Sequence, residues 1–169
     1  MVQAVIFDVD GTRVDSVDIY ARAWRDAFRD FGHDIEFDRI REQIGKGSGQ
    51  LMPVFIKPPE LDDKGKEIEQ HRAEILKSRY LDQITAFPQV WALFRRLLAD
   101  GKKIALASST KEDELEKYKQ LDQIDDLIRT ETSSDDAKKS KPHPDIFQAA
   151  MKRLSDIPPS EILVVGDTA

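Results

Sequence analysis

The sequence of 169 residues contains no cysteine and only three histidines. Disulfide bonds, thiol nucleophiles and cysteine-ligated metals are therefore excluded, and no histidine cluster suggests a zinc site. Because nothing in this composition signals an oxidising compartment, the cytoplasm is the expected location.

The chain also lacks an excess of basic residues and any long apolar run. Its 26 lysines and arginines stand against 32 aspartates and glutamates, and this acidic balance argues against nucleic-acid and anionic-membrane partners. No run approaches the roughly 18 apolar residues of a membrane-spanning helix. The amino terminus, "MVQAVIFDVD", has no basic residue before an apolar run that is too short for a signal peptide.

Short apolar runs alternate with amphipathic stretches in much of the chain. The runs "AVIF" (4–7), "KIALA" (103–107) and "ILVV" (162–165) predict strands buried on both faces of a parallel sheet. Two helices are expected between them, with the apolar positions Val90, Leu93, Phe94, Leu97 and Leu98 before Gly101, and Ile146, Phe147, Ala150, Met151 and Leu154 after Pro144. This order predicts a doubly wound α/β fold.

Residues 17–82 contain no convincing strand and predict helices instead. One helix is expected from Ser16, a possible N-cap, to Gly32. Its apolar face is Ile19, Tyr20, Ala23, Trp24, Ala27, Phe28 and Phe31. A second, exposed helix is expected within Leu61–Leu81, with Ile68, Ile75, Leu76 and Tyr80 on its inner side. We therefore expect an α/β core from residues 1–16 and 83–169, with a helical domain inserted at 17–82.

The segment "FDVDGTRVDS" places Asp8 and Asp10 directly after the first apolar run. A polar turn closing a strand explains "DG" but not the acid at the strand end. Two carboxylates about 4 Å apart repel by roughly 4 kcal/mol at an effective dielectric near 20. The pair therefore needs a metal ion, a lysine or a shared proton.

Four segments, in order, carry a family resemblance: "DVDGTRVDS", "SST" at 108–110, "SKPHPDIF" at 140–147 and "VVGDT" at 164–168. Together they resemble the motifs of haloacid dehalogenase superfamily hydrolases. The helical insertion resembles the cap of the subgroup that contains phosphoglycolate phosphatases and β-phosphoglucomutases. The resemblance implies a Rossmann-like core, an inserted helical cap and hydrolysis of small phosphorylated metabolites.

The resemblance also implies roles for individual residues. Asp8 would be the nucleophile that forms an aspartyl-phosphate, and Asp10 would protonate the leaving oxygen and then deprotonate water. Mg²⁺ would be bound by Asp8, Asp167 and the main-chain carbonyl of Asp10. Lys141 would contact both Asp8 and the transferring phosphoryl group.

Three further positions complete the implied site, with Ser108 as a catalytic residue and Ser109 and Lys46 as substrate contacts. Ser108, directly after an apolar strand, would donate to a phosphoryl oxygen, with Ser109 as a further substrate contact. Ser109 also has capping-box spacing with Glu112, which favours a structural role for Ser109 or Thr110. Lys46 resembles part of the glycine-rich cap segment that faces substrate, and a solvated loop lysine is an equally simple interpretation.

The chain departs from its apparent relatives at three places. Position 13, commonly aliphatic, is Arg13, which must reach water or a carboxylate such as Asp15 unless the protein is destabilised. Position 20, often histidine in mutase-like relatives, is Tyr20. Relatives continue beyond "GDT", so we expect the carboxyl-terminal part of the core to be missing after Ala169 and the edge of the "ILVV" strand to be exposed.

Two alternatives to a phosphatase remain open. A phosphomutase of the same family would return the phosphoryl group to a sugar phosphate, although Tyr20 argues against it. A noncatalytic binding module would retain the fold and the Mg²⁺ site without turnover. The oligomeric state is not indicated by the sequence.

Overall fold

The computed structural model describes residues 1–110, 114, 115, 118, 121, 128, 130–139, 141 and 143–167. Ser140, Pro142 and Thr168 of the sequence motifs, together with Glu112 and Ala169, lie outside the described residues. The chain divides into two compact units, each described by itself. The core unit comprises Met1–Asp15 and Thr85–Ala169, and the helical unit comprises Ser16–Ile84.

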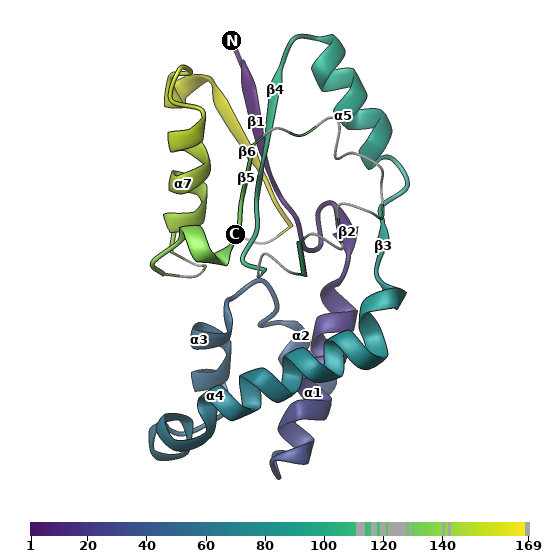
Figure 1. Ribbon diagram of the computed structural model, residues 1–169, viewed down its shortest axis with the longest axis vertical. Coiled ribbons are helices and arrows are strands. Elements are labelled where there is room, and N and C mark those ends of the chain that lie inside the picture. Colours follow the sequence, from purple (N-terminus) through teal and green to yellow (C-terminus); the bar gives the residue numbers. More distant parts are fainter. Residues whose placement is uncertain are drawn as a thin grey trace. The chain divides into compact units, whose positions relative to one another are not determined.

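A parallel sheet forms the centre of the core unit (Figure 1). Its four strands among the described residues follow the order β5-β4-β1-β6. Their bounds are Ala4–Asp8 for β1, Lys103–Ala107 for β4, Glu131–Thr132 for β5 and Ile162–Val165 for β6. Neighbouring strands pair in parallel throughout. Three of these strands were predicted from apolar runs, and β5 was not.

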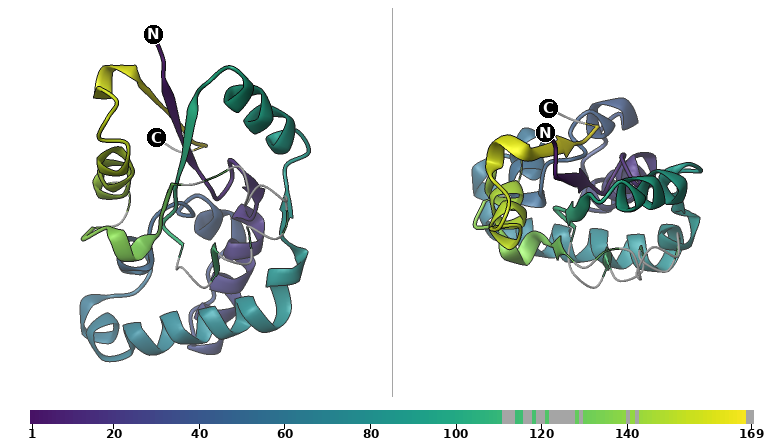
Figure 2. Two further views of the ribbon diagram at one scale, coloured as in Figure 1. Left: turned by 45° about the horizontal axis from the view of Figure 1, so that its top comes forward. Right: turned by 90° about the horizontal axis from the view of Figure 1, so that it is seen from above.

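Alternate residues of β1 face different helices. Ala4 and Ile6 pack in one cluster with Ile146 and Ala150 of α7 (Asp145–Arg153). On the other face, the ring of Phe7 lies 4.7 Å from that of Phe94 in α5 (Val90–Ala99). Figure 1 and both views of Figure 2 show α5 and α7 on opposite sides of the sheet. The structure therefore confirms the doubly wound α/β arrangement.

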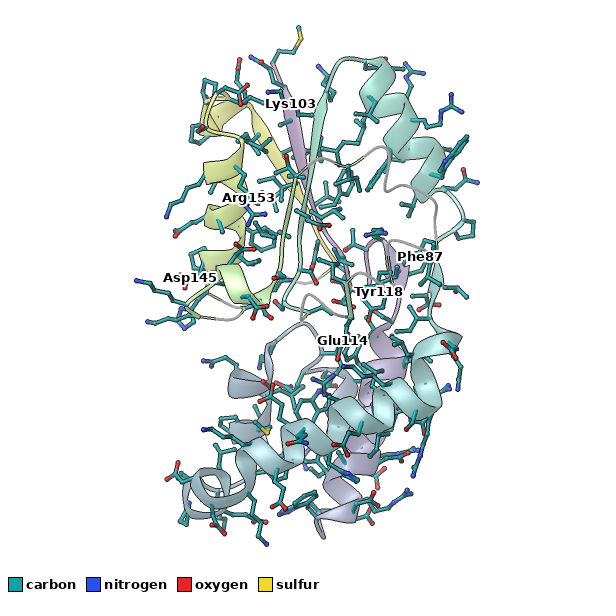
Figure 3. All side chains as sticks on the ribbon, in the orientation of Figure 1. Phe87, Lys103, Glu114, Tyr118, Asp145 and Arg153 are labelled. Atoms are coloured by element: carbon teal, nitrogen blue, oxygen red, sulfur yellow. The ribbon has the colours of Figure 1, made fainter. Side chains whose placement is uncertain are left out.

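Shorter elements complete the core unit. Strands β2 (Val14–Asp15) and β3 (Thr85–Ala86) pair in antiparallel fashion. The 3₁₀ turns are η4 (Ser134–Asp136) and η5 (Pro159–Glu161). Arg153, labelled in Figure 3, donates from α7 to the Glu131 carbonyl and to the Asp136 carboxylate. This contact ties α7 to β5 and η4.

Two expectations about burial were wrong. Leu93, expected on the inner face of α5, is 46% exposed, because α5 packs on the sheet through a narrow stripe containing Val90 and Phe94. Strand β6 was expected to be buried on both faces, yet Leu163 is 49% exposed and Val164 is similarly open. In the described part of the chain, β6 pairs only with β1 and lies at the sheet edge, as the family resemblance predicted.

The helical unit contains the two helices expected in the insertion, α1 (Val17–Asp30) and α4 (Pro58–Ile75), and several shorter elements that were not predicted. The shorter elements are α2 (Phe37–Arg41), α3 (Ser48–Leu51), η1 (Met52–Val54), η2 (Leu76–Tyr80) and η3 (Leu81–Gln83). Helix α4 packs across α1 (Figure 2). Ser16 lies at the N-cap of α1 without a capping side-chain hydrogen bond, whereas Gly32 ends the helix with a φ of +89°. In the part of the chain that the structure describes, no helix has the length and apolar character needed to cross a membrane.

Candidate active site

The carboxyl ends of the parallel strands bring the predicted core-unit residues to one edge of the sheet. Asp8 is the last residue of β1 and pairs in register with Ala107, the last residue of β4, so Ser108 follows at the same edge. Asp167 follows β6 by two residues and is exposed. In open α/β sheets, ligands bind outside this edge.

Asp8 forms a buried ion pair with Lys141. The Asp8 carboxylate is 2% exposed, and its Oδ2 accepts a hydrogen bond from the Lys141 ammonium. The amide of Val9 donates to Asp8 Oδ1 at 2.8 Å. The Lys141 ammonium also lies 5.5 Å from the centre of the Phe147 ring. The predicted lysine therefore contacts the predicted nucleophile directly.

The surroundings of Asp8 act on its pKa in opposite directions. Burial raises the pKa of Asp8 to about 6, the nearby Asp10 charge adds to this rise, and Lys141 and the Val9 amide oppose it. Lys141 therefore keeps a buried carboxyl group ionised near neutral pH. An ionised oxygen is the form that can act as a nucleophile.

Asp10 is placed by a tight turn after β1. Gly11 adopts a φ of +73°, a left-handed conformation that costs other residues roughly 1–2 kcal/mol. Its amide donates to the Val14 carbonyl at 3.0 Å, and the Val14 amide donates back to the Val9 carbonyl at 3.1 Å. The turn explains why "DG" follows the strand, and it carries the half-buried Asp10 two residues beyond Asp8.

Hydroxyl groups from the end of β4 meet Asp10. Thr110 Oγ1 donates to Asp10 Oδ2 at 2.6 Å, and Ser108 Oγ lies 3.5 Å from the same oxygen. Ser108 is fully buried, and its Oγ accepts a hydrogen bond from the Thr110 amide at 3.0 Å. The sequence favoured a structural role for Ser109 or Thr110 and did not predict a contact between Thr110 and Asp10. The only sequence signal for it was a third hydroxyl residue after the strand.

Ser109 lines a cavity of about 240 Å³ within the core unit. Ser108, Ser134, Ala137, Lys138 and Ile146 form the rest of its lining. The structure thus places Ser108 and Ser109 on one cavity wall, next to a loop lysine. The lining combines serine residues and a lysine with the apolar side chains of Ala137 and Ile146, so it is mixed in character.

The donor set at the sheet edge is compatible with Mg²⁺. The Asp8 carboxylate, the Asp10 carbonyl and the Asp167 carboxylate are all oxygen donors, which Mg²⁺ prefers. Nowhere among the described residues do three or more His, Cys, Asp or Glu side chains gather closely enough to hold a metal. A bound Mg²⁺ would therefore need the main-chain carbonyl together with water or substrate oxygens, which is how proteins commonly bind this ion.

Arg13 corrects an expectation from the sequence. Its side chain is 1% exposed, so it does not reach water, and its Nη2 donates to the backbone carbonyl of Tyr118 at 2.9 Å. Burial excludes the expected contact with bulk water, the Tyr118 carbonyl is a partner that the sequence did not predict, and a contact with a carboxylate such as Asp15 stays a prediction. Figure 3 labels Tyr118 in the core unit. Hydrogen bonding at Nη2 offsets part of the cost of burying the guanidinium.

Lys46 and Tyr20 belong to the helical unit. The Lys46 ammonium donates to the side-chain oxygen of Gln43, so a contact between Lys46 and substrate stays a prediction. Tyr20 is buried in α1, with the Arg72 guanidinium 5.7 Å from its ring centre. The same guanidinium lies 5.2 Å from the centre of the Trp24 ring. Tyr20 is therefore a packed core residue of its unit.

With this geometry established, the comparisons with known proteins decide the family. The profile of the family described as haloacid dehalogenase-like hydrolase matches residues 2–169. The chain belongs to the haloacid dehalogenase-like hydrolases. The family resemblance carried by the four sequence motifs is confirmed.

Individual proteins are similar to the chain over nearly its whole length. A phosphorylated carbohydrates phosphatase from Thermotoga maritima is 26% identical over 167 residues, which are 98% of this chain and 76% of that protein. A putative pyrophosphatase from Clostridium perfringens is 25% identical and covers 99% of this chain and 76% of its own length. A solved hydrolase from Pseudomonas syringae aligns with a TM-score of 0.86 and 28% identity, covering 99% of this chain and 76% of that structure.

Proposed function

We propose that this hydrolase is a Mg²⁺-dependent phosphatase of small phosphorylated metabolites that acts through an aspartyl-phosphate on Asp8. The observation that carries the proposal is the buried Asp8–Lys141 pair at the carboxyl edge of the sheet. Burying two charges carries a desolvation penalty that their attraction often does not repay, so a buried ion pair at a sheet edge favours a functional role over a purely stabilising one. The two relatives named as phosphatases support the same reaction class.

In the first half of the reaction, an Asp8 carboxylate oxygen attacks phosphorus and the bond to the leaving oxygen breaks. Asp10 gives its proton to that leaving oxygen, so an alcohol departs and Asp10 becomes a carboxylate. Lys141 offsets the negative charge of Asp8 and of the phosphoryl group that approaches it. Ser108 lies at the same strand end, where its hydroxyl can meet a phosphoryl oxygen.

In the second half, Asp10 takes a proton from water as the water oxygen attacks phosphorus. The bond between phosphorus and the Asp8 oxygen breaks, which releases inorganic phosphate and regenerates the Asp8 carboxylate. Asp10 is protonated again at the end, so the cycle closes without another proton carrier. The two carboxylates therefore need different environments, which they have: Asp8 is buried against Lys141, and the half-buried Asp10 accepts hydrogen bonds from hydroxyl groups.

Asp8, Asp167 and the Asp10 carbonyl would hold Mg²⁺. When bound, the ion would neutralise negative charge on the phosphoryl oxygens and on the carboxylates around them. We further propose that the helical unit is the cap that selects the substrate and that Lys46 is one of its substrate contacts. One of the two relatives is named for phosphorylated carbohydrates and the other for pyrophosphate. The phosphate ester that this hydrolase prefers is therefore to be identified with a panel of substrates.

The test is phosphate release from p-nitrophenyl phosphate in the presence of Mg²⁺. We expect Asp8→Asn to abolish turnover and a chelator to do the same. Asp15→Asn is the matched control, because Asp15 is an exposed aspartate of the same sequence segment and lies in β2. Turnover that survives Asp8→Asn would contradict the proposal. Interconversion of hexose phosphates faster than phosphate release would favour the mutase instead.

A further inference from the structure

The short hydrogen bond between Thr110 and Asp10 joins two segments of the core unit that are 100 positions apart in the sequence. The Thr110 hydroxyl donates to Asp10 Oδ2 at 2.6 Å, and Thr110 is 6% exposed. The Ser108 hydroxyl, at 3.5 Å from the same oxygen, is at the limit of hydrogen bonding. Thr110 therefore supplies the stronger of these two hydroxyl contacts.

The backbone around Thr110 fixes the direction of its side chain. Its amide donates to Ser108 Oγ at 3.0 Å, and its carbonyl accepts from the Ser134 amide at 3.1 Å. Ser108 is anchored in turn, because its amide donates to the Thr132 carbonyl at 3.0 Å. Threonine is β-branched and has few χ1 rotamers, so a fixed backbone also fixes the hydroxyl.

We propose that Thr110 is a positioning residue that orients the Asp10 carboxyl group for proton transfer to the leaving oxygen. This inference rests on the proposed function, in which Asp10 is the acid. A half-buried carboxyl group after a tight turn can rotate about its side-chain bonds, and proton transfer requires it to point at the ester oxygen. The hydroxyl on Oδ2 restricts this rotation.

Thr110→Val tests the inference because it keeps the branched shape and removes the hydroxyl. The readout is kcat/KM for a series of aryl phosphates, from p-nitrophenyl phosphate to phenyl phosphate. A good leaving group such as nitrophenolate departs without a proton, whereas phenolate needs the acid. General acid–base catalysis contributes about 10²–10⁴-fold, so we expect Thr110→Val to lose roughly tenfold or more with phenyl phosphate and little with p-nitrophenyl phosphate.

Two further variants separate positioning from a loss of structure. Thr110→Ser restores a hydroxyl at the same place, and we expect it to recover the activity with phenyl phosphate. Thr132→Val is the matched control, because Thr132 is a buried threonine whose hydroxyl donates to the Leu106 carbonyl at 3.2 Å. It should leave the dependence on leaving group unchanged. If Thr110→Val does not fold, as judged by circular dichroism, Thr110→Ala is measured in its place.

A double-mutant cycle completes the test. In an Asp10→Asn background there is no acid left to orient, so removing the Thr110 hydroxyl should have no further effect on the leaving-group dependence. Equal losses across the substrate series, or an undiminished effect in the Asp10→Asn background, would overturn the inference. Failure of the proposed function is seen separately, as wild-type turnover that does not depend on Asp8.

Discussion

Lys141 donates a hydrogen bond to the Asp8 carboxylate although 133 positions separate the two residues in the sequence. Asp8 ends the central strand β1, and Lys141 lies in the loop before α7. Both side chains are largely buried, so each charge depends on the other for compensation. A change to either residue is therefore expected to alter both the stability of the core unit and the proposed activity at the carboxyl edge of the sheet.

Removing the cation should cost both stability and activity. Lys141→Met leaves the Asp8 carboxylate buried without its partner, and we expect the free energy of unfolding to fall by about 3 kcal/mol at pH 7. The loss should shrink below pH 5, where Asp8 can be protonated. Denaturant unfolding at pH 7 and below pH 5 measures the loss in free energy of unfolding. Lys139→Met is the control, because Lys139 is an exposed lysine of the same loop. Equal losses at the two pH values would contradict the assignment.

The stability of the metal-free protein should depend on pH through Asp8. Burial raises the pKa of Asp8 to about 6, above its ordinary value of about 3.9 in an unfolded chain. Between roughly pH 4 and pH 6, Asp8 therefore binds more protons in the folded protein than in the unfolded chain. The contribution of Asp8 to the free energy of unfolding falls as the pH rises through this range. At 1.36 kcal/mol per pKa unit, the fall approaches about 3 kcal/mol. Thermal unfolding of Asp8→Asn between pH 4 and pH 6 should not show this fall in stability. The same fall in the variant as in the wild type would show that Asp8 is not its source.

Mg²⁺ should stabilise the protein by binding ionised Asp8. A ligand at a hundred times its dissociation constant raises the free energy of unfolding by about 2.7 kcal/mol. We expect a larger rise in Tm with Mg²⁺ at pH 7 than at pH 5, where protonation of Asp8 competes with the metal. Asp167→Asn should weaken the effect, whereas Asp135→Asn, a change at another exposed aspartate of the core unit, should not. An equal rise in Tm with Mg²⁺ in the two variants would show that Asp167 does not bind the metal.

Gly11 should be required for both folding and activity. Its φ of +73° disfavours any side chain, so Gly11→Ala should destabilise the protein by roughly 1–2 kcal/mol. Because the turn places Asp10, kcat should fall as well. Gly49→Ala is the control, since Gly49 has no positive φ and no atom within 4 Å of an added Cβ. Wild-type activity in Gly11→Ala would show that the turn does not position Asp10.

The fold was predictable where the sequence signal is local. Strands β1, β4 and β6 are continuous apolar runs, and each was expected within one residue of its observed bounds. Strand β5 has only two residues, Glu131 and Thr132, and becomes a strand by pairing with β4. The apolar run of β6 predicted burial on both faces, and only the family resemblance, which places this strand at the sheet edge, pointed to its exposure.

The site was predictable where a motif carries it. Asp8, Asp10, Ser108 and Lys141 were assigned from three of the four segments, and the structure shows Lys141 in contact with Asp8, while the catalytic roles stay predictions. The contact between Thr110 and Asp10 was not found, because the capping-box spacing of Ser109 with Glu112 favoured a local structural role for Ser109 or Thr110. The contact between Arg13 and the backbone carbonyl of Tyr118 could not be found either, since every residue has such a carbonyl group.

The most direct test of the account is to trap the phosphoryl group on Asp8. Asp10→Asn should still be phosphorylated by p-nitrophenyl phosphate, whose leaving group needs no acid, and it should then lack the base that activates water. After an acid quench, mass spectrometry of the peptide containing Asp8 should show one added phosphoryl group, absent when Asp8→Asn is combined with Asp10→Asn. Release of phosphate by Asp10→Asn without any phosphorylated Asp8 would contradict the proposed mechanism.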